Sequence, residues 1–373
     1  MAGSSFGTLF RITTWGESHG RALGVTIDGC PSGIELCEDD IQSELDRRKP
    51  GSNPYGTKRN ESDTAQILSG VFEGKTTGTP ITIVVFNADH HSADYSNIAD
   101  KYRPGHADYG FDAKYGFRDY RGGGRSSGRE TLSRVAAGAV AKKLLDSIGI
   151  SVMAYTVSIG KIEIDREKSD ISKRFDNPLV MPDNDAAKRA ADYLDSLMAV
   201  GDSAGGVIEC VINGVPAGVG EPVFDKLDAM LGEAMFSIGA VKGVEFGAGF
   251  SAAQMTGSQN NDPFRSENGE VIKLTNNSGG ILGGLSDGGE ILFRAAFKPT
   301  PSISKQQMTV TKQGENTEIE IKGRHDPIIV PRAIVVVEAM SAIVVSDMIL
   351  RSMTSDINKI RTFFSEKYFR KGE

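Results

Sequence analysis

The stretch RGGGRSSGRET, residues 121–131, leads directly into a long amphipathic pattern at 131–148. Ser127 and Glu130 precede that pattern with the three-residue spacing of a capping box. We therefore expect a glycine-rich loop that ends in a helix packed on a core. The apolar side chains that set the helical spacing are Leu132, Val135, Ala136, Ala139, Val140 and Leu144.

The same loop has the features of an anion-binding site. A helix N-terminus offers unpaired N–H groups and the positive end of the dipole, and Ser126 and Ser127 add hydroxyls. Guanidinium groups match phosphate and carboxylate geometry. A well-capped helix with solvated arginines is the alternative, but four arginines within fourteen residues of an acidic chain favour the anion site. They are Arg121, Arg125, Arg129 and Arg134.

Hydrophobic periodicity places further elements along the chain. It predicts helices over Glu38–Arg48, 185–198 and 224–238, and strands over Ile81–Phe86, 152–164, 205–213 and 290–297. Residues 309–321 read as a hairpin around Gly314, and 333–351 as a helix whose valine run also fits a strand. Helices and strands interleave without strict alternation, so periodicity alone indicates a mixed α/β protein.

Composition limits the function classes. The chain has 373 residues, with 42 Lys and Arg against 49 Asp and Glu, a net charge of −7. This argues against a general nucleic-acid or anionic-membrane binder and leaves a small anionic ligand possible in a local arginine cluster. The three cysteines suggest neither a disulfide framework nor a zinc site. With no leader-like start and no apolar run long enough to span a bilayer, we expect a soluble, reduced, cytoplasmic protein.

Two glycine motifs are decoys. The segment 70–76 nearly matches a phosphate-binding P-loop but has three residues between its glycines where four are needed. Gly218 and Gly220 do not continue into a dinucleotide fingerprint, because Pro222 follows them. We expect an ordinary turn between strands at 70–76.

Three histidines stand beside glycine and charged residues: His19, His106 and His325. Imidazole titrates near neutral pH and suits proton transfer, although a single loop histidine is more often merely solvated. No pair of histidines has metal-ligand spacing, so no metal is expected. Lys298-Pro-Thr-Pro-Ser302 follows a strand, and its two prolines either orient the hydroxyls toward a site or form a rigid turn.

Taken together, seven segments resemble the chorismate synthase family in order and spacing. They are 16–20, 46–51, 103–108, 122–131, 237–243, 298–302 and 323–327. The resemblance covers nearly the whole chain. It implies one catalytic domain over residues 1–373 with an α+β fold, a β-α-β sandwich whose helices pack between antiparallel sheets. It also implies a homo-oligomer, commonly a tetramer.

The resemblance further implies a carbon–oxygen lyase at the last common step of aromatic amino acid biosynthesis, the shikimate pathway. 5-Enolpyruvylshikimate 3-phosphate loses phosphate and a ring proton in a 1,4-anti elimination and becomes chorismate. Reduced FMN is required without net redox change. NADPH is a candidate reductant, and whether the protein reduces its own flavin or uses an external flavin reductase stays open.

Residue roles follow from the matched motifs alone. His19 would give a proton to the departing phosphate, His106 would protonate the reduced flavin, and Asp326 would assist flavin N5. Pro54 departs from the family pattern, since many relatives carry there an arginine linked to phosphate or NADP contacts. The FMN contacts would be Arg125, Ser126, Ser127, Gly239, Ala240, Gly283, Lys298, Pro299, Thr300, Pro301, Ser302 and Arg324, and the substrate or NADP contacts Arg48, Arg129 and Arg134.

Two other functions remain compatible with the residues. One is a flavin-dependent oxidoreductase that consumes NAD(P)H with another substrate. The other is a non-catalytic module that binds a phosphorylated ligand.

Overall fold

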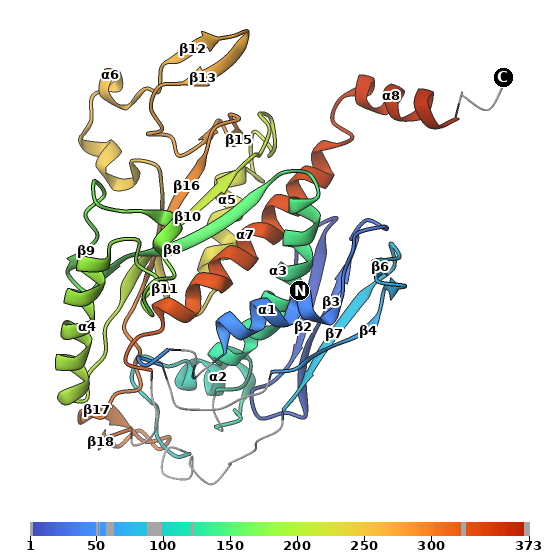
Figure 1. Ribbon diagram of the computed structural model, residues 1–373. Coiled ribbons are helices and arrows are strands. Elements are labelled where there is room, and N and C mark those ends of the chain that lie inside the picture. The colour runs from blue at the N-terminus through green and yellow to red at the C-terminus, as the bar shows by residue number, and fades with distance from the viewer. Residues whose placement is uncertain are drawn as a thin grey trace.

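The computed structural model describes residues 3–49, 51, 53–56, 63–87, 99–120, 123–321 and 326–368. Two five-stranded antiparallel sheets enclose a layer of helices (Figure 1). The first sheet has the order β1 (Ser5–Phe6), β2 (Arg11–Gly16), β3 (Ala22–Asp28), β7 (Ile81–Phe86), β4 (Ala65–Ser69). The second has the order β11 (Val241–Phe246), β16 (Ile291–Phe297), β10 (Gly206–Asn213), β8 (Ser151–Ile159), β9 (Ile162–Glu163).

Side-chain alternation explains why each sheet has one core face. In β3, Leu23, Val25 and Ile27 are fully buried, and β7 pairs with it so that Val25 lies opposite Ile83. In β16, Ile291, Phe293 and Ala295 are buried at the same two-residue period. Successive side chains of a strand point to opposite faces of the sheet, so every second side chain points toward the helices between the sheets.

The helical layer consists mainly of α1 (Glu38–Arg48), α3 (Thr131–Asp146), α5 (Leu227–Phe236) and α7 (Val330–Ser352). Among the described residues, α7 alone is long and apolar enough to cross a membrane, yet 89% of its apolar window is buried inside the protein. It therefore serves as the central core helix. Gly138 of α3 permits close packing, because a Cβ there would lie 2.2 Å from the Cβ of Ala339 on α7.

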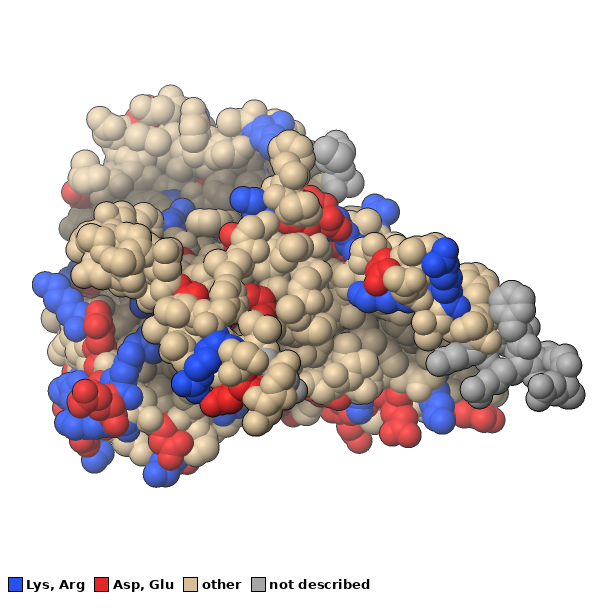
Figure 2. Space-filling view, turned by 90° about the horizontal axis from the view of Figure 1, so that it is seen from above, with Lys and Arg blue, Asp and Glu red and all other residues tan. Residues whose placement is uncertain are grey.

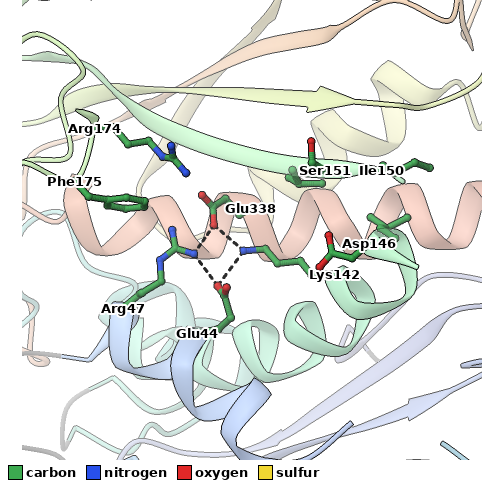
Figure 3. Close-up of a pocket in the computed structure, with 11 residues that line it drawn as sticks. Glu44, Arg47, Lys142, Asp146, Ile150, Ser151, Arg174, Phe175 and Glu338 are labelled. Atoms are coloured by element: carbon green, nitrogen blue, oxygen red, sulfur yellow. Dashed lines mark hydrogen bonds and ion pairs between the residues drawn. The ribbon is translucent and has the colours of Figure 1, made fainter. Parts of the chain in front are cut away.

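A ring of charges ties the layer together around Glu338, which is buried in α7 (Figure 3). Arg47 and Lys142 each contact both Glu338 and Glu44, at distances of 2.7 to 2.9 Å. The other oxygen of Glu338 accepts the backbone N–H of Ala154 in β8. Burial alone would raise the pKa of Glu338, but Lys142 and Arg47 outweigh it and hold that pKa below its ordinary value.

The remaining elements surround this frame (Figure 1). The helix α8 projects from the end of α7. The additional helices are α2 (Asp108–Tyr115), α4 (Asn184–Ala199), α6 (Gly257–Asn260) and α8 (Ile357–Tyr368). The hairpins are β5 (Val71–Phe72) with β6 (Lys75–Thr76), β12 (Phe264–Glu267) with β13 (Glu270–Lys273), β14 (Ile281–Leu282) with β15 (Leu285–Ser286), and β17 (Gln307–Val310) with β18 (Asn316–Ile319).

The predicted α+β sandwich is confirmed. The helix α1 and the strand β7 begin and end at the residues predicted from the sequence. The near P-loop is the ordinary β5–β6 turn. The single strand predicted over 152–164 is wrong, because the chain turns at Gly160, with φ of 57°, and returns as β9. The valine run near the C-terminus is helical rather than extended, because α7 is buried on all sides.

The surface shows how the net charge of −7 is distributed. Figure 2 shows one face on which acidic and basic side chains stand in small, interspersed groups between wide areas of other residues.

Candidate functional site

Three arginines from distant parts of the chain meet where helices of the central layer begin or end. Arg48 ends α1, Arg129 stands just before α3, and Arg332 lies in the first turn of α7. Arg332 donates from Nε to the carbonyl of Arg48 at 3.0 Å. The N-termini of α3 and α7 add the positive ends of their dipoles to the same region, so the site carries a local positive field.

Asp63 is the shared counter-ion of two of these arginines. Its side chain is fully buried, it contacts Nη2 of Arg48, and Nη1 of Arg129 lies 2.9 Å away. Arg48 is itself 1% exposed. Burial lowers the pKa of Arg48, the positive charges of Arg332 and Arg129 lower it further, and Asp63 opposes them. Arg48 is therefore enclosed by the protein and does not reach the surface of the site.

Asn87 connects this arginine group to the loop that carries His19. The Nε of Arg129 donates to Oδ1 of Asn87 at 2.9 Å. The side-chain amide of Asn87 in turn donates to the carbonyls of Gly20 and Glu17, at 2.7 and 3.2 Å. Both sides of the short loop around His19 are thus held by one amide, and that amide is oriented by Arg129.

A second carboxylate, Glu130, organises two more predicted site arginines. Its Oε2 lies 2.8 Å from Nε of Arg134, and its Oε1 lies 3.6 Å from Nη2 of Arg125. Thr14 completes the group, since its hydroxyl donates to Glu130 at 2.9 Å and accepts from Arg125 at 2.6 Å. The structure therefore brings Arg125 and Arg134 together around one buried carboxylate.

This arrangement corrects the predicted capping box. The hydroxyl of Ser127 accepts the N–H of Arg129 at 3.3 Å and caps a short 3-10 turn, whereas a capping box would require the N–H of Glu130. Glu130 does not return to the backbone of Ser127. Its carboxylate is only 6% exposed, and pairing with two arginines satisfies it better than one amide at the surface would.

The predicted flavin-binding segments meet beside Arg134. Its Nη1 donates to the hydroxyl of Ser237 at 2.6 Å, at the end of α5. Three residues later, Ala240 has a φ of 76°, a left-handed conformation that non-glycine residues rarely adopt. Its carbonyl accepts the backbone N–H of Lys298 at 2.9 Å. Ala240 therefore lies against the start of the segment 298–302.

His106 lies on the other side of that segment. A hydrogen bond of 2.8 Å joins its Nε2 to the hydroxyl of Ser302, and Nζ of Lys298 donates to the carbonyl of Gly105 at 2.6 Å. Burial, with a contribution from nearby Lys242, lowers the pKa of Lys298. The loop before His106 is fixed by Arg103, whose side chain makes two hydrogen bonds of 2.8 Å to Asp108.

Asp326 joins the arginine group from the C-terminal side. Its Oδ2 lies 2.7 Å from Nη1 of Arg332, and its Oδ1 faces Gly56. Next to it, the carbonyl of Pro327 accepts the N–H of Ala204 at 2.9 Å, and the neighbouring Ser203 donates to the carbonyl of Thr300 at 2.7 Å. Asp326 is thereby connected to both the arginine group and the segment 298–302.

Gly283, another predicted flavin contact, lies away in space from Ser237 and Ala240. It sits in the β14–β15 turn, whose Gly284 accepts the N–H of Leu227 at the start of α5. Ser237, beside the site, follows the other end of this ten-residue helix, about 15 Å away. Figure 1 likewise shows β15 and β17 at opposite ends of the molecule. Arg324 and His325, as well as Arg121, lie outside the described residues.

The residues present fit a flat, phosphorylated cofactor. The hydroxyl oxygen of Thr300 is buried and has no hydrogen-bond partner within the described part of the chain. Pro299 and Pro301 fix the backbone around it, and a Cβ on Gly239 would meet no atom within 4 Å. A rigid loop with an unsatisfied buried donor fits a bound ring system with polar edges.

The sequence analysis assigned no ligand-binding or catalytic role to four residues of this site: Asp63, Asn87, Glu130 and Arg332. Glu130 had the spacing of a cap, which hid its pairing with arginines. Arg332 carried a readable signal, because it is one of few charges in the long apolar segment 328–345. Asp63 and Asn87 stand in ordinary polar sequence, and only tertiary contacts identify them.

A polar cavity of about 330 Å³ lies further along α1 and α7. The charge ring of Figure 3 lines it, together with Asp146, Arg174 and Phe175. Its central charges already satisfy one another, so we assign it a structural role. Among the described residues, no group of three His, Cys, Asp or Glu side chains could hold a metal ion.

Comparisons with known proteins agree on one family. The chorismate synthase family model matches residues 10–350. A chorismate synthase of Lachnoclostridium phytofermentans is 61% identical over 367 residues, which cover 98% of this chain and 100% of that protein. One from Methanosarcina mazei is 54% identical, with coverage of 94% and 97%. A crystal structure of chorismate synthase superposes with a TM-score of 0.76 at 33% identity, covering 97% of this chain and 98% of that one.

Proposed function

Because this chain belongs to the chorismate synthase family, a family of carbon–oxygen lyases in aromatic biosynthesis, we propose that it converts 5-enolpyruvylshikimate 3-phosphate to chorismate. The reaction is a 1,4-anti elimination in which the ring C–O bond to phosphate breaks and a ring proton leaves. One observation carries the proposal: Asp63, Glu130 and Asp326 hold five arginines close to the loop that carries His19, and His106 is bonded to the nearby Ser302.

The arginines would bind the anions of the substrate, which carries a phosphate and two carboxylates. Arg129 and Arg134 are partly exposed and flank the start of α3, so they would contact it directly. Arg48 is buried beneath them and would act mainly through its charge. Fixed cations placed where negative charge develops on the leaving phosphate stabilise the transition state.

Proton transfer would be divided among three side chains. His19, in the loop held by Asn87, would give a proton to the departing phosphate. His106 would hold a proton on its ring and is oriented by Ser302 through Nε2. Asp326, whose carboxylate Arg332 holds in place, would assist flavin N5 in the removal of the ring proton. Imidazole and carboxylate side chains are common general acids and bases.

Reduced FMN would lie against Arg125, Ser126, Ser127, Gly239, Ala240 and the segment 298–302, with Arg324 as a further contact. When bound, it supplies electron density that helps the allylic phosphate to leave, without net redox change. The protein residues position it: the buried hydroxyl of Thr300 and the backbone at Ala240 define one wall, and Arg125 fixes the loop before α3.

The same proposal includes a homo-oligomer, as a tetramer. Gly283 lies about the length of α5 away from Ala240 within one chain. We propose that Gly283 contacts the flavin in the site of a neighbouring copy. Native mass spectrometry at micromolar concentration is expected to show a tetramer, and a monomer would contradict this part of the proposal.

The remaining expectations concern the setting of the enzyme. We propose one catalytic domain over 1–373, supported by a hydrophobic cluster shared by both sheets and the helices between them. NADPH or an external flavin reductase would keep the flavin reduced. A cytoplasmic location stays a prediction from the sequence, as does the absence of membrane and nucleic-acid partners.

An anaerobic assay tests the function. Purified protein, dithionite-reduced FMN and enolpyruvylshikimate phosphate are mixed, and chorismate is followed by its absorbance. We expect many turnovers per flavin without NADPH consumption. Consumption of one NADPH per product would favour an oxidoreductase, and tight substrate binding that does not strengthen with FMN would favour a non-catalytic module.

A histidine variant tests the site within that assay. Replacing His106 by Ala is expected to lower kcat by about 10²- to 10⁴-fold, the usual effect of losing a general acid. Replacing Ser302 by Ala, which removes only the partner of Nε2, should cost less. An unchanged rate in His106→Ala would remove the histidine from the mechanism.

A further inference from the structure

We propose that Arg332 is a positioning residue for Asp326 in this reaction. The inference rests on the proposed function, because Arg332 would act through Asp326, the carboxylate proposed to assist the removal of the ring proton. Neither the sequence motifs nor the comparisons give Arg332 a role.

The contacts of Arg332 fix its guanidinium in two directions. Nη1 lies 2.7 Å from Oδ2 of Asp326, and Nε donates to the backbone carbonyl of Arg48 at 3.0 Å. The side chains of Arg332 and Asp326 are 19% and 15% exposed, so water screens the pair only in part. Because the guanidinium is rigid and planar, two separate contacts determine its orientation, and with it the position of Asp326.

The backbone of Arg332 is also well fixed. It lies in the first turn of α7, after Pro331, and its N–H donates to the carbonyl of Ile329 at 3.1 Å. Asp326, by contrast, belongs to no helix or strand. Arg332 on the rigid helix therefore fixes the carboxylate of Asp326 in the loop, whereas Asp326 contributes little to the position of Arg332.

The same contacts argue against a direct substrate contact as the main role. Arg332 already gives Nη1 to a carboxylate and Nε to a carbonyl, and the nearby cations Arg48 and Arg129 share Asp63. Lysine at position 332 would keep the charge but could not reproduce both contacts of the planar fork. Position and charge can therefore be separated by experiment.

The experiment compares Arg332→Gln and Arg332→Lys with Arg351→Gln. Arg351 lies at the other end of α7 and pairs with Asp225 at 2.8 Å, so its replacement is a matched control. We expect Arg332→Gln to lower kcat about 10- to 100-fold, as loss of an orienting partner does, with KM and the FMN dissociation constant changed by less than about threefold. Arg332→Lys should recover part of the rate.

Two further measurements separate positioning from a general effect. In a cycle with Asp326→Asn, the double variant should be no slower than Asp326→Asn alone, since one variant removes what the other positions. Without any ligand, hydrogen exchange in the peptide 326–332 should be at least about threefold faster in Arg332→Gln than in the wild type. Arg351→Gln should change neither quantity.

Several outcomes would overturn the inference. A raised KM at unchanged kcat would make Arg332 a substrate contact, and additive losses in the cycle would make its effect independent of Asp326. Unchanged hydrogen exchange would show that Arg332 does not hold the loop. If Arg332→Gln does not fold, Arg332→Lys must show a lower kcat at a nearly unchanged KM. A wild-type protein without activity refutes the proposed function instead, and the exchange experiment still decides whether Arg332 holds the loop.

Discussion

At the scale of single residues, the site is a set of arginines whose geometry is set by buried carboxylates. Asp63 holds Arg48 and Arg129, and Glu130 holds Arg125 and Arg134. A carboxylate shared by two guanidinium groups leaves the group a net positive charge. It also keeps long side chains in place before a ligand binds, which reduces the side-chain conformational entropy lost on binding.

Glu130 is the residue where this view is most easily tested. Replacing it by Gln keeps the shape but leaves two guanidinium groups without a shared anion. We expect the free energy of unfolding to fall by about 3 kcal/mol, since breaking a buried charge pair is strongly destabilising. Urea unfolding measures it, with the exposed Glu163→Gln as the control. Equal stability of the two variants would contradict the role of Glu130.

At the scale of elements, helix ends decide where the site forms. The end of α1 and the starts of α3 and α7 converge, and each contributes an arginine there. Their convergence depends on how closely α3 and α7 pack. Gly138 determines that distance, because any side chain there would meet the backbone of Ala339.

A pair of glycine-to-alanine variants tests this packing. Gly138→Ala gains about 1 kcal/mol of helix propensity, but its methyl group would lie 2.5 Å from the Cα of Ala339. We expect a net loss of about 1 to 3 kcal/mol from overpacking. Gly232→Ala in α5 meets no atom within 4 Å and should stabilise the protein slightly. Thermal unfolding compares them, and a stabilising Gly138→Ala would refute the close contact.

At the scale of the whole molecule, Glu338 connects the central helix to α1, to α3 and to the second sheet. The ring of Figure 3 joins three helices around a carboxylate that is 2% exposed, and the second oxygen of this carboxylate accepts a hydrogen bond from β8. A charge buried this deeply stabilises the fold only while its two cations accompany it.

The stability contributed by Glu338 should depend on pH. Its pKa in the folded protein is lowered, so the contribution is fully present above the unfolded value of about 4.3 and is lost as pH falls through the folded value. We expect Glu338→Gln to be about 3 kcal/mol less stable than the wild type at pH 7. Urea unfolding should show this difference shrinking below about pH 4. A difference that stays constant into acid would contradict the assignment.

The sequence alone predicted much of the fold, because its signals are local. The acidic first turn and basic last turn of Glu38–Arg48 complement the helix dipole, and the helix has those bounds. The β-branched run Ile81–Phe86 forms β7 as predicted. The turn at Gly160 escaped prediction, since hydrophobic residues continue on both sides of it and only pairing between β8 and β9 reveals it.

By itself, the sequence determined the family, the α+β sandwich and the segments that form the site. Motifs and periodicity allow this because they depend on residues that are close together in the sequence. Only the tertiary structure decided which groups face one another. It paired Glu130 with two arginines in place of a backbone amide, buried Arg48 against Asp63, and placed Arg332 beside Asp326. Charges choose partners by distance in space and by burial, and neither is recorded in the spacing of residues along a chain.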